Sequence, residues 1–153
     1  MFGRILYIGE SEAHVENLIK DANSADLMNV NVIFEDSKGT ILGEVEELNE
    51  NIIKIRFLGE YINNKYVNGV LRKPLLNSKI RMINKEELTE LVGTYSASSF
   101  ILGESAIYKG FNIHPSINNL FSNHLAIFGN SGSGKSCGVA RIVQNLFSSM
   151  FQV

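Results

Sequence analysis

Eight residues close to the C-terminus have the types and the spacing of a phosphate-binding loop. They are Gly129, Asn130, Ser131, Gly132, Ser133, Gly134, Lys135 and Ser136, in the pattern G-x-x-x-x-G-K-[ST]. Glycine permits the backbone to wrap closely around phosphates, where a Cβ would collide or φ must be positive. The amides of residues 131–136 would converge on phosphate oxygens, helped by the positive end of the next helix. The pattern therefore predicts a nucleoside triphosphate site.

Three side chains of this stretch have predicted roles. Lys135 would reach the β- and γ-phosphates, and the Ser136 hydroxyl would ligate Mg²⁺. Cys137 completes the predicted set of nucleotide-binding residues. It is also the only cysteine of the chain. Its thiol is either sensitive to oxidation or packed as a small residue in the first helical turn, and the second interpretation is favoured.

The residues on both sides of the loop fit the strand–loop–helix arrangement that the pattern requires. Residues 125–128 are a short apolar run, as expected of a buried parallel strand. The following apolar residues recur at helical spacing: Val139, Ile142, Val143, Leu146, Phe147 and Met150. The alternative, a glycine- and serine-rich turn that precedes a helix by chance, is disfavoured because both flanks agree with the motif.

Composition describes a globular chain of 153 residues with 44% hydrophobic and 20% charged residues. No apolar run approaches the roughly 20 residues of a membrane span. The first residues lack the layout of a signal peptide. A single cysteine excludes an intrachain disulfide and fits a reducing compartment, so a cytoplasmic location is predicted.

Charge is unevenly distributed, although the net charge is only −2. Residues 1–60 carry 5 Lys/Arg against 12 Asp/Glu, whereas residues 61–153 carry 9 against 4. Much of the positive charge belongs to a basic strip that consists of Lys65, Arg72, Lys73, Lys79, Arg81 and Lys85. Such a strip is usually a solvated face, and the sharper interpretation is a surface that faces a polyanion.

Short strands separated by turn clusters dominate the first part of the chain. Strands are predicted at residues 4–8, 30–34, 40–47, 52–58, 70–71 and 79–83. Residues 11–28 suggest at most a short helix or an irregular excursion, and residues 59–69 a loop. A helix is expected over residues 85–92, then a linker near 96–99, and further strands at 100–104 and 106–109. This pattern favours a small closed barrel or a sandwich.

The predicted fold is therefore mixed. A small β-barrel would occupy residues 1–92. Residues 93–153 would begin a RecA-like α/β ATPase domain with its first strand, phosphate-binding loop and helix. The domain boundary is expected near residues 90–100.

This layout resembles the HerA-like group of the HerA/FtsK superfamily of ATP-driven DNA translocases. Residues 39–45 and 69–74 look like hairpins of the small N-terminal barrel of that group. Residues 101–104 are similar to the short sequence that opens its ATPase domain. Residues 122–136, with His124 before the strand, look like its phosphate-binding block. Asn130 and Ser131 depart mildly from it, because threonine is commonest after the variable position.

The resemblance implies ATP and Mg²⁺ as cofactors, a homo-hexameric ring formed through the full ATPase domain, duplex DNA in its channel and a nuclease partner. His124 would lie at the rear of the site, or would cap the strand or be solvated, which is favoured. Two other functions stay open. One is a conjugation- or packaging-type motor that moves another polymer, and the other is a non-enzymatic barrel that serves docking or assembly.

Catalytic residues of that family are expected to lie outside this chain. No Asp or Glu follows Glu104, and Arg141 comes too early to be the family's arginine finger. Exposing the large apolar residues of the last helix would forgo roughly 1.5–3 kcal/mol of burial apiece. We therefore expect the chain to be the front of a longer protein that does not hydrolyse ATP by itself.

Overall fold

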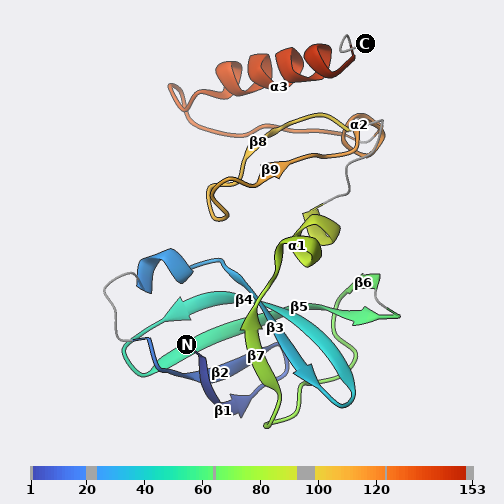
Figure 1. Ribbon diagram of the computed structural model, residues 1–153. Helices are drawn as coiled ribbons and strands as arrows, with labels where there is room; N and C mark the ends of the chain where they lie inside the picture. The colour runs from blue at the N-terminus through green and yellow to red at the C-terminus, as the bar shows by residue number, and fades with distance from the viewer. Residues whose placement is uncertain (1, 20–23, 64, 93–98, 123, 151–153) are drawn as a thin grey trace. The chain divides into compact units, whose positions relative to one another are not determined.

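The structure is a computed structural model that describes residues 2–19, 24–63, 65–92, 99–122 and 124–150 (Figure 1). Its strands are β1 (Phe2–Ile8), β2 (Glu12–Asn17), β3 (Asn31–Asp36), β4 (Gly39–Leu48), β5 (Ile52–Ile62), β6 (Lys65–Asn68), β7 (Lys79–Met82), β8 (Gly103–Glu104) and β9 (Asn112–Ile113). Its helices are the 3₁₀ turn η1 (Ser24–Leu27), α1 (Lys85–Val92), α2 (Ile117–Phe121) and α3 (Lys135–Met150). None of the described helices is long and apolar enough to cross a bilayer.

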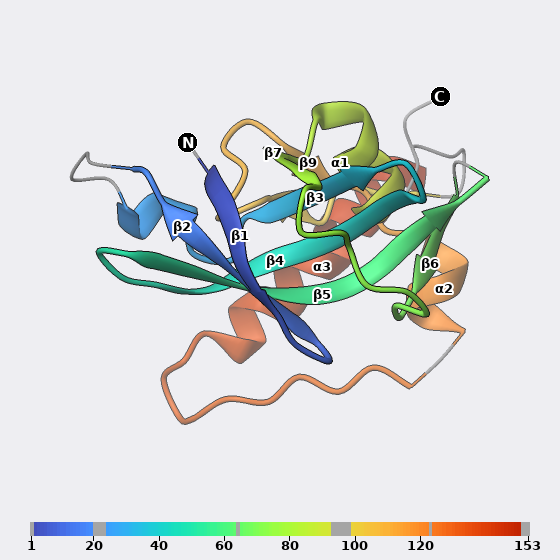
Figure 2. The same cartoon turned by 90° about the horizontal axis from the view of Figure 1, so that it is seen from below.

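The chain divides into two compact units, Met1–Glu87 and Leu88–Val153. In the first unit, seven antiparallel strands form one sheet with the order β1-β2-β5-β4-β3-β7, and β6 pairs with β5. Figure 2 shows these long strands curving around one another. The end strands β1 and β7 do not pair within the described residues, so the sheet is a half-barrel and not the predicted closed barrel.

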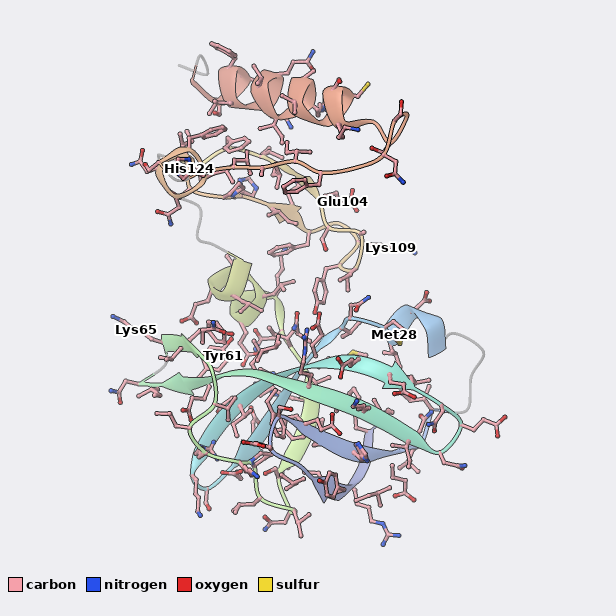
Figure 3. The ribbon with its side chains drawn as sticks, turned by 180° about the vertical axis from the view of Figure 1, so that it is seen from behind. Met28, Tyr61, Lys65, Glu104, Lys109 and His124 are labelled. Carbon is pink, nitrogen blue, oxygen red and sulfur yellow. The ribbon has the colours of Figure 1, made fainter. Side chains whose placement is uncertain are left out.

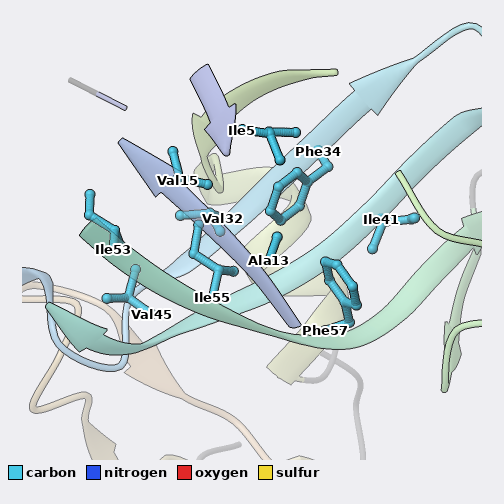
Figure 4. Packing of buried hydrophobic residues seen from close by; sticks show 10 residues of the cluster. All are labelled: Ile5, Ala13, Val15, Val32, Phe34, Ile41, Val45, Ile53, Ile55 and Phe57. Carbon is cyan, nitrogen blue, oxygen red and sulfur yellow. The ribbon is translucent and has the colours of Figure 1, made fainter. Parts of the chain in front are cut away.

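The concave face of this sheet holds the hydrophobic core. Its buried residues come from five strands (Figure 4): Ile5, Ala13, Val15, Val32, Phe34, Ile41, Val45, Ile53, Ile55 and Phe57. Ile80 of β7 packs partly buried against the same cluster. Both end strands, β1 and β7, thus contribute to one core, which explains how an open sheet stays curled.

Gly43 allows the strands to approach closely at the bend. A Cβ at this position would lie 2.6 Å from Ile55 Cγ2 and 3.2 Å from the Phe34 ring. The pairing of β4 with β5 also shifts register beside Gly43. Bulges and glycines of this kind bend and twist a strand, so they supply the curvature of the half-barrel.

Several local predictions are confirmed. The predicted strands at 4–8, 30–34, 40–47, 52–58 and 79–83 all form, and β3 pairs with β4 as the expected hairpin. Helix α1 covers the predicted residues 85–92. Gly93 and the linker residues 96–98 lie outside the described residues. The assignment of residues 1–92 and 93–153 as two domains stays a prediction.

Other local predictions are wrong. Residues 12–17 form strand β2 between β1 and β5, where at most a short helix or an irregular excursion was predicted. The loop predicted at 59–69 is largely the end of β5 and strand β6. Residues 70–71 form no strand, and only residues 103–104 of the predicted strand 100–104 pair. Residues 106–109 form a bend and turn before β9.

The second unit contains the small β8–β9 hairpin, α2 and α3. Phe100 and Phe111 are buried here, and the Phe100 and Phe121 ring centroids lie 6.1 Å apart. The Ser116 side chain caps α2 by accepting a hydrogen bond from the Asn119 amide. The apolar face of α3 is only partly covered: Val139, Val143 and Phe147 are 44%, 41% and 54% exposed.

The strand predicted before the phosphate-binding loop is not formed. Residues 124–130 carry no β-structure, and Phe128 is 91% exposed. A buried parallel strand needs hydrogen-bonded neighbours, and no described residues supply a ladder to this segment. The helix of the predicted strand–loop–helix unit is present as α3, whereas the strand is not.

Candidate functional site

The candidate site is the loop of residues 129–134 together with the first turn of α3. The Ser133 amide donates to the Asn130 carbonyl over 3.2 Å and closes a turn at the loop tip. The Gly138 amide donates to the Gly134 carbonyl over 2.8 Å, so regular helix begins directly after the loop. Asn130, Ser131 and the rest of the loop are exposed. The free amides of the helix start therefore face an accessible space, as phosphate binding requires.

The three glycines of the loop differ in what they provide. Gly132 and Gly134 have φ of +80° and +82°, a conformation that other L-residues rarely adopt. A Cβ on either of them would meet open space, so conformation is the constraint there. A Cβ on Gly129 would collide with Ser133 Oγ. A larger residue at 129 would therefore need the Ser133 side chain to move, whereas the loop backbone itself does not clash.

Lys135 holds the loop closed. Its Nζ donates to the carbonyls of Gly129 and Asn130, each over 2.7 Å. The ammonium therefore lies across the mouth of the loop and is half-buried, although it begins a surface helix. A positive charge held at a set of free amides is suited to bind an anion with several oxygens.

The neighbouring predicted residues lie at the surface. Ser136 is exposed at the start of α3, where its hydroxyl can reach a ligand of the loop. Cys137 is a free, exposed thiol, so the interpretation of a residue packed in the first turn is wrong. His124 is exposed, which agrees with the favoured interpretation of a solvated side chain. Figure 3 labels His124, Glu104 and Lys109 in this unit.

Two members of the basic strip are neutralised by buried or half-buried carboxylates. Arg81 Nη2 lies 2.7 Å from Glu35 Oε1 and 2.6 Å from Glu87 Oε1. Hydrogen bonds from Arg81 lower the pKa of Glu87 against the opposing effect of burial. Arg72 faces two carboxylates of the half-barrel. All four lysines of the strip are exposed, and Lys85 has a contact partner, so lysines 65, 73 and 79 are left to meet a polyanion.

Asp36 is the centre of the cluster that contains Arg72. Its side chain is 3% exposed, and Oδ2 accepts from Ser78 Oγ over 2.7 Å and from the Leu75 amide over 3.1 Å. Arg72 Nη1 lies 3.2 Å from Oδ1. Burial raises the pKa of Asp36, but these bonds and the Lys38 amide outweigh it and hold the pKa at about 2. The cluster fastens the loop 69–78 to the β3–β4 turn.

Glu60 anchors the same loop from β5. Its side chain is 7% exposed, and Oε1 accepts from the Leu71 amide over 3.1 Å. The loop nevertheless points its apolar side chains outward, since Leu71 is 93% and Leu76 65% exposed. Two buried carboxylates thus hold the loop backbone while leucines face solvent.

The cap of α1 could have been found in the sequence, whereas the Asp36–Glu60–Arg72 cluster could not. The Asn84 side chain accepts from the Glu87 amide, and the Glu87 carboxylate accepts from the Asn84 amide, at 2.8 and 3.0 Å. This is a capping box, and its spacing of three residues before a helix could have been found in the sequence. Asp36, Glu60 and Arg72 are far apart in sequence, so only the fold brings them together.

Comparison with known protein families places the last part of the chain. Residues 107–153 match the family described as Helicase HerA, central domain. The matched segment covers less than a third of the chain and includes the whole candidate site. A search of curated proteins found no match. The family match supports a HerA-like family, whose ATPase domain uses a nucleotide and Mg²⁺ in general.

Proposed function

We propose that residues 129–137 bind MgATP and that the chain is the ATP-binding portion of a HerA-like DNA translocase. The observation that carries this proposal is the closed loop itself. Two glycines with positive φ and the Lys135 ammonium lie directly before the free amides of α3, inside the segment that matches the HerA family. This combination supports phosphate binding better than a chance glycine-rich turn does.

The residues present fit the two expected cofactors. Gly129, Gly132 and Gly134 place no Cβ at three positions of the loop, and the exposed amides can supply donors to phosphate oxygens. Lys135 would hold the β- and γ-phosphates, and Ser136 would hold Mg²⁺. The metal, when bound, neutralises part of the phosphate charge. Two of the three N–H donors of Lys135 bond the carbonyls of Gly129 and Asn130, so the third can donate to a phosphate oxygen.

The nucleotide site is tested with Lys135→Ala and the matched control Lys109→Ala. Each variant removes one lysine charge from the second unit, but Lys109 lies in the turn before β9, outside the loop. We expect Lys135→Ala to weaken MgATP binding at least about tenfold in calorimetry, because a charge-assisted hydrogen bond is lost. Lys109→Ala should bind as the wild type does. Equal affinity of the two variants would remove Lys135 from the proposed site.

The DNA part of the proposal concerns the exposed lysines of the basic strip. Arg72 and Arg81 are engaged by carboxylates, so Lys65, Lys73 and Lys79 are the candidates for phosphate contacts. Replacing all three by Ala should weaken duplex DNA binding and lower the slope of log affinity against log salt by up to about 3. Duplex DNA binding with no salt dependence would contradict the DNA part of the proposal and would not affect the nucleotide site.

The hexameric ring and the nuclease partner belong to the same proposal. A conjugation- or packaging-type motor would share the nucleotide site and differ in its polymer, so the DNA titration separates it. One observation favours the docking module: Leu71 and Leu76 are exposed on a loop that is fixed by buried carboxylates. A chain that binds neither MgATP nor DNA would leave the docking module as the function.

A further inference from the structure

A cleft of about 690 Å³ lies within the second unit, away from the glycine-rich loop. One wall consists of residues 99–104, including β8, and Asn112 of β9 contributes to it. The other wall is α3, which presents Arg141, Asn145, Ser148 and Ser149. This volume falls within the range of small-molecule sites.

The orientation of α3 is what makes this cleft unusual. Residues 141, 145, 148 and 149 are spaced by four, three and one, so they occupy one face of the helix. The apolar residues Val139, Val143 and Phe147 occupy the opposite face and are 41–54% exposed. A helix normally turns its apolar face toward its own domain. Here the polar face lines the cleft, and Arg141 and Ser148 are exposed there, so a polar ligand can reach them.

Arg141 supplies the unused hydrogen-bond donors of the cleft, because both serines donate their hydroxyl protons within α3. Ser148 Oγ donates to the Gln144 carbonyl over 2.9 Å, and Ser149 Oγ donates to the Leu146 carbonyl over 2.7 Å. Asn145 Nδ2 makes one long bond of 3.4 Å to the Leu102 carbonyl. In the described ranges Arg141 has neither an ion pair nor a hydrogen bond, so its full fork of donors is available.

The cleft holds one cationic side chain, Arg141, and one carboxylate, Glu104. No Asp or Glu occurs after residue 104. Glu104, the one carboxylate in the wall, accepts from the Gly110 amide over 2.6 Å, so it is held by the β8–β9 turn. An unpaired guanidinium beside free amide donors suits a planar, multi-oxygen anion, because the fork can bind two of its oxygens.

We propose that this cleft binds a small phosphate ester, with the phosphoryl group on Arg141 and the acceptor groups of its carrier on Asn112 and Asn145. The site is separate from the glycine-rich loop. Its residues do not include Lys135 or Ser136, and Arg141 follows Lys135 by roughly 9 Å along the helix. The proposal therefore stands or falls independently of MgATP binding at residues 129–137.

The test is a titration of the isotope-labelled full chain with AMP, followed by NMR of the amides of residues 99–104 and the side-chain amides of Asn112 and Asn145. We expect saturable shifts at these groups. Arg141→Ala should weaken AMP binding at least about tenfold, since the charged partner is lost. Lys109→Ala, which removes an equal charge outside the cleft, and Lys135→Ala should leave these shifts unchanged.

Three results would overturn the proposal. The first is no saturable shift at the cleft up to about 10 mM AMP, which corresponds to less than about 3 kcal/mol of binding. The second is an equal loss with Lys109→Ala, which would indicate unspecific charge attraction. The third is inorganic phosphate binding as tightly as AMP, because the carrier would then contribute nothing. If Arg141→Ala retains part of the affinity for AMP, Arg141→Glu should abolish binding, because a carboxylate repels the phosphoryl group. Circular dichroism checks that this variant is folded.

Discussion

The two compact units bury their apolar residues to very different extents. In the first, side chains of β1, β2, β3, β4 and β5 close one core, and Phe34, Ile53 and Ile55 are fully buried. In the second, α3 leaves Val139, Val143 and Phe147 exposed, although its amphipathic spacing is as regular as that of any packed helix. The half-barrel is held by its own contacts. The glycine-rich loop and α3 keep their backbone shape through local hydrogen bonds.

This contrast shows that the glycine-rich loop and the hydrophobic core depend on residues at different distances along the chain. The loop geometry depends on glycine conformations, one lysine and the start of a helix, all within ten residues. A core depends on strands that meet from distant parts of the chain. Mutations should therefore have large effects on folding in the half-barrel and small ones in α3.

The sharpest test replaces one phenylalanine in each unit. Phe34→Ala should lower the free energy of unfolding by about 3–5 kcal/mol, because it removes a fully buried ring from the core. Phe147→Ala should lower it less, by about 1 kcal/mol, since that residue is 54% exposed. Urea denaturation of both variants measures the difference. An equal loss of unfolding free energy in the two variants would contradict the difference in packing between the units.

Asp36 tests whether polar contacts add to the stability of the half-barrel. Asp36→Ala should cost about 3 kcal/mol in urea denaturation, because Arg72 loses its buried partner and the Leu75 amide its acceptor. It should also speed hydrogen exchange at the amides of Leu71 and Leu75. Asp36→Asn, which retains an acceptor of similar shape, is the matched control and should cost less. No change in exchange would show that the loop 69–78 is held by other contacts.

The smallest effect is the pH dependence that Asp36 contributes. Its folded pKa is about 2 and its ordinary value 3.8, so the folded state favours the charged carboxylate. The resulting stabilisation, about 2 kcal/mol, is complete above pH ~5 and is lost as the pH falls toward 2. Denaturation midpoints measured between those values should fall more steeply for the wild type than for Asp36→Asn. Parallel curves would contradict the role of Asp36.

The sequence predicted features that depend on neighbours along the chain. Alternating residues in 40–47 and 52–58 identified β4 and β5, and acidic residues before an apolar pattern identified α1. Strand β2 was missed because only Ala13 and Val15 reach the core, and pairing with β1 and β5 decides its structure. Tertiary partners also decide the structure of residues 125–128. This apolar run forms no strand because no neighbouring strand pairs with it among the described residues.

The candidate site was predicted as a set of residues but not as an arrangement. The motif identified the loop, yet the bonds of Lys135 to its own backbone and the exposure of Cys137 required the structure. The cleft beside α3 carried no sequence signal, because the polar face of an amphipathic helix normally indicates solvent.

The contacts of Lys135 have a consequence for how fast and how selectively the loop can bind. A free lysine side chain loses up to about 2 kcal/mol of rotamer entropy when it is fixed. Lys135 is already fixed by two 2.7 Å bonds, so that loss precedes the arrival of a ligand. One N–H donor of the ammonium is left, so a small anion such as chloride would gain one hydrogen bond from the resting side chain, whereas a phosphate chain could also engage the helix amides. At the proposed site, this arrangement would favour ligands with many oxygens.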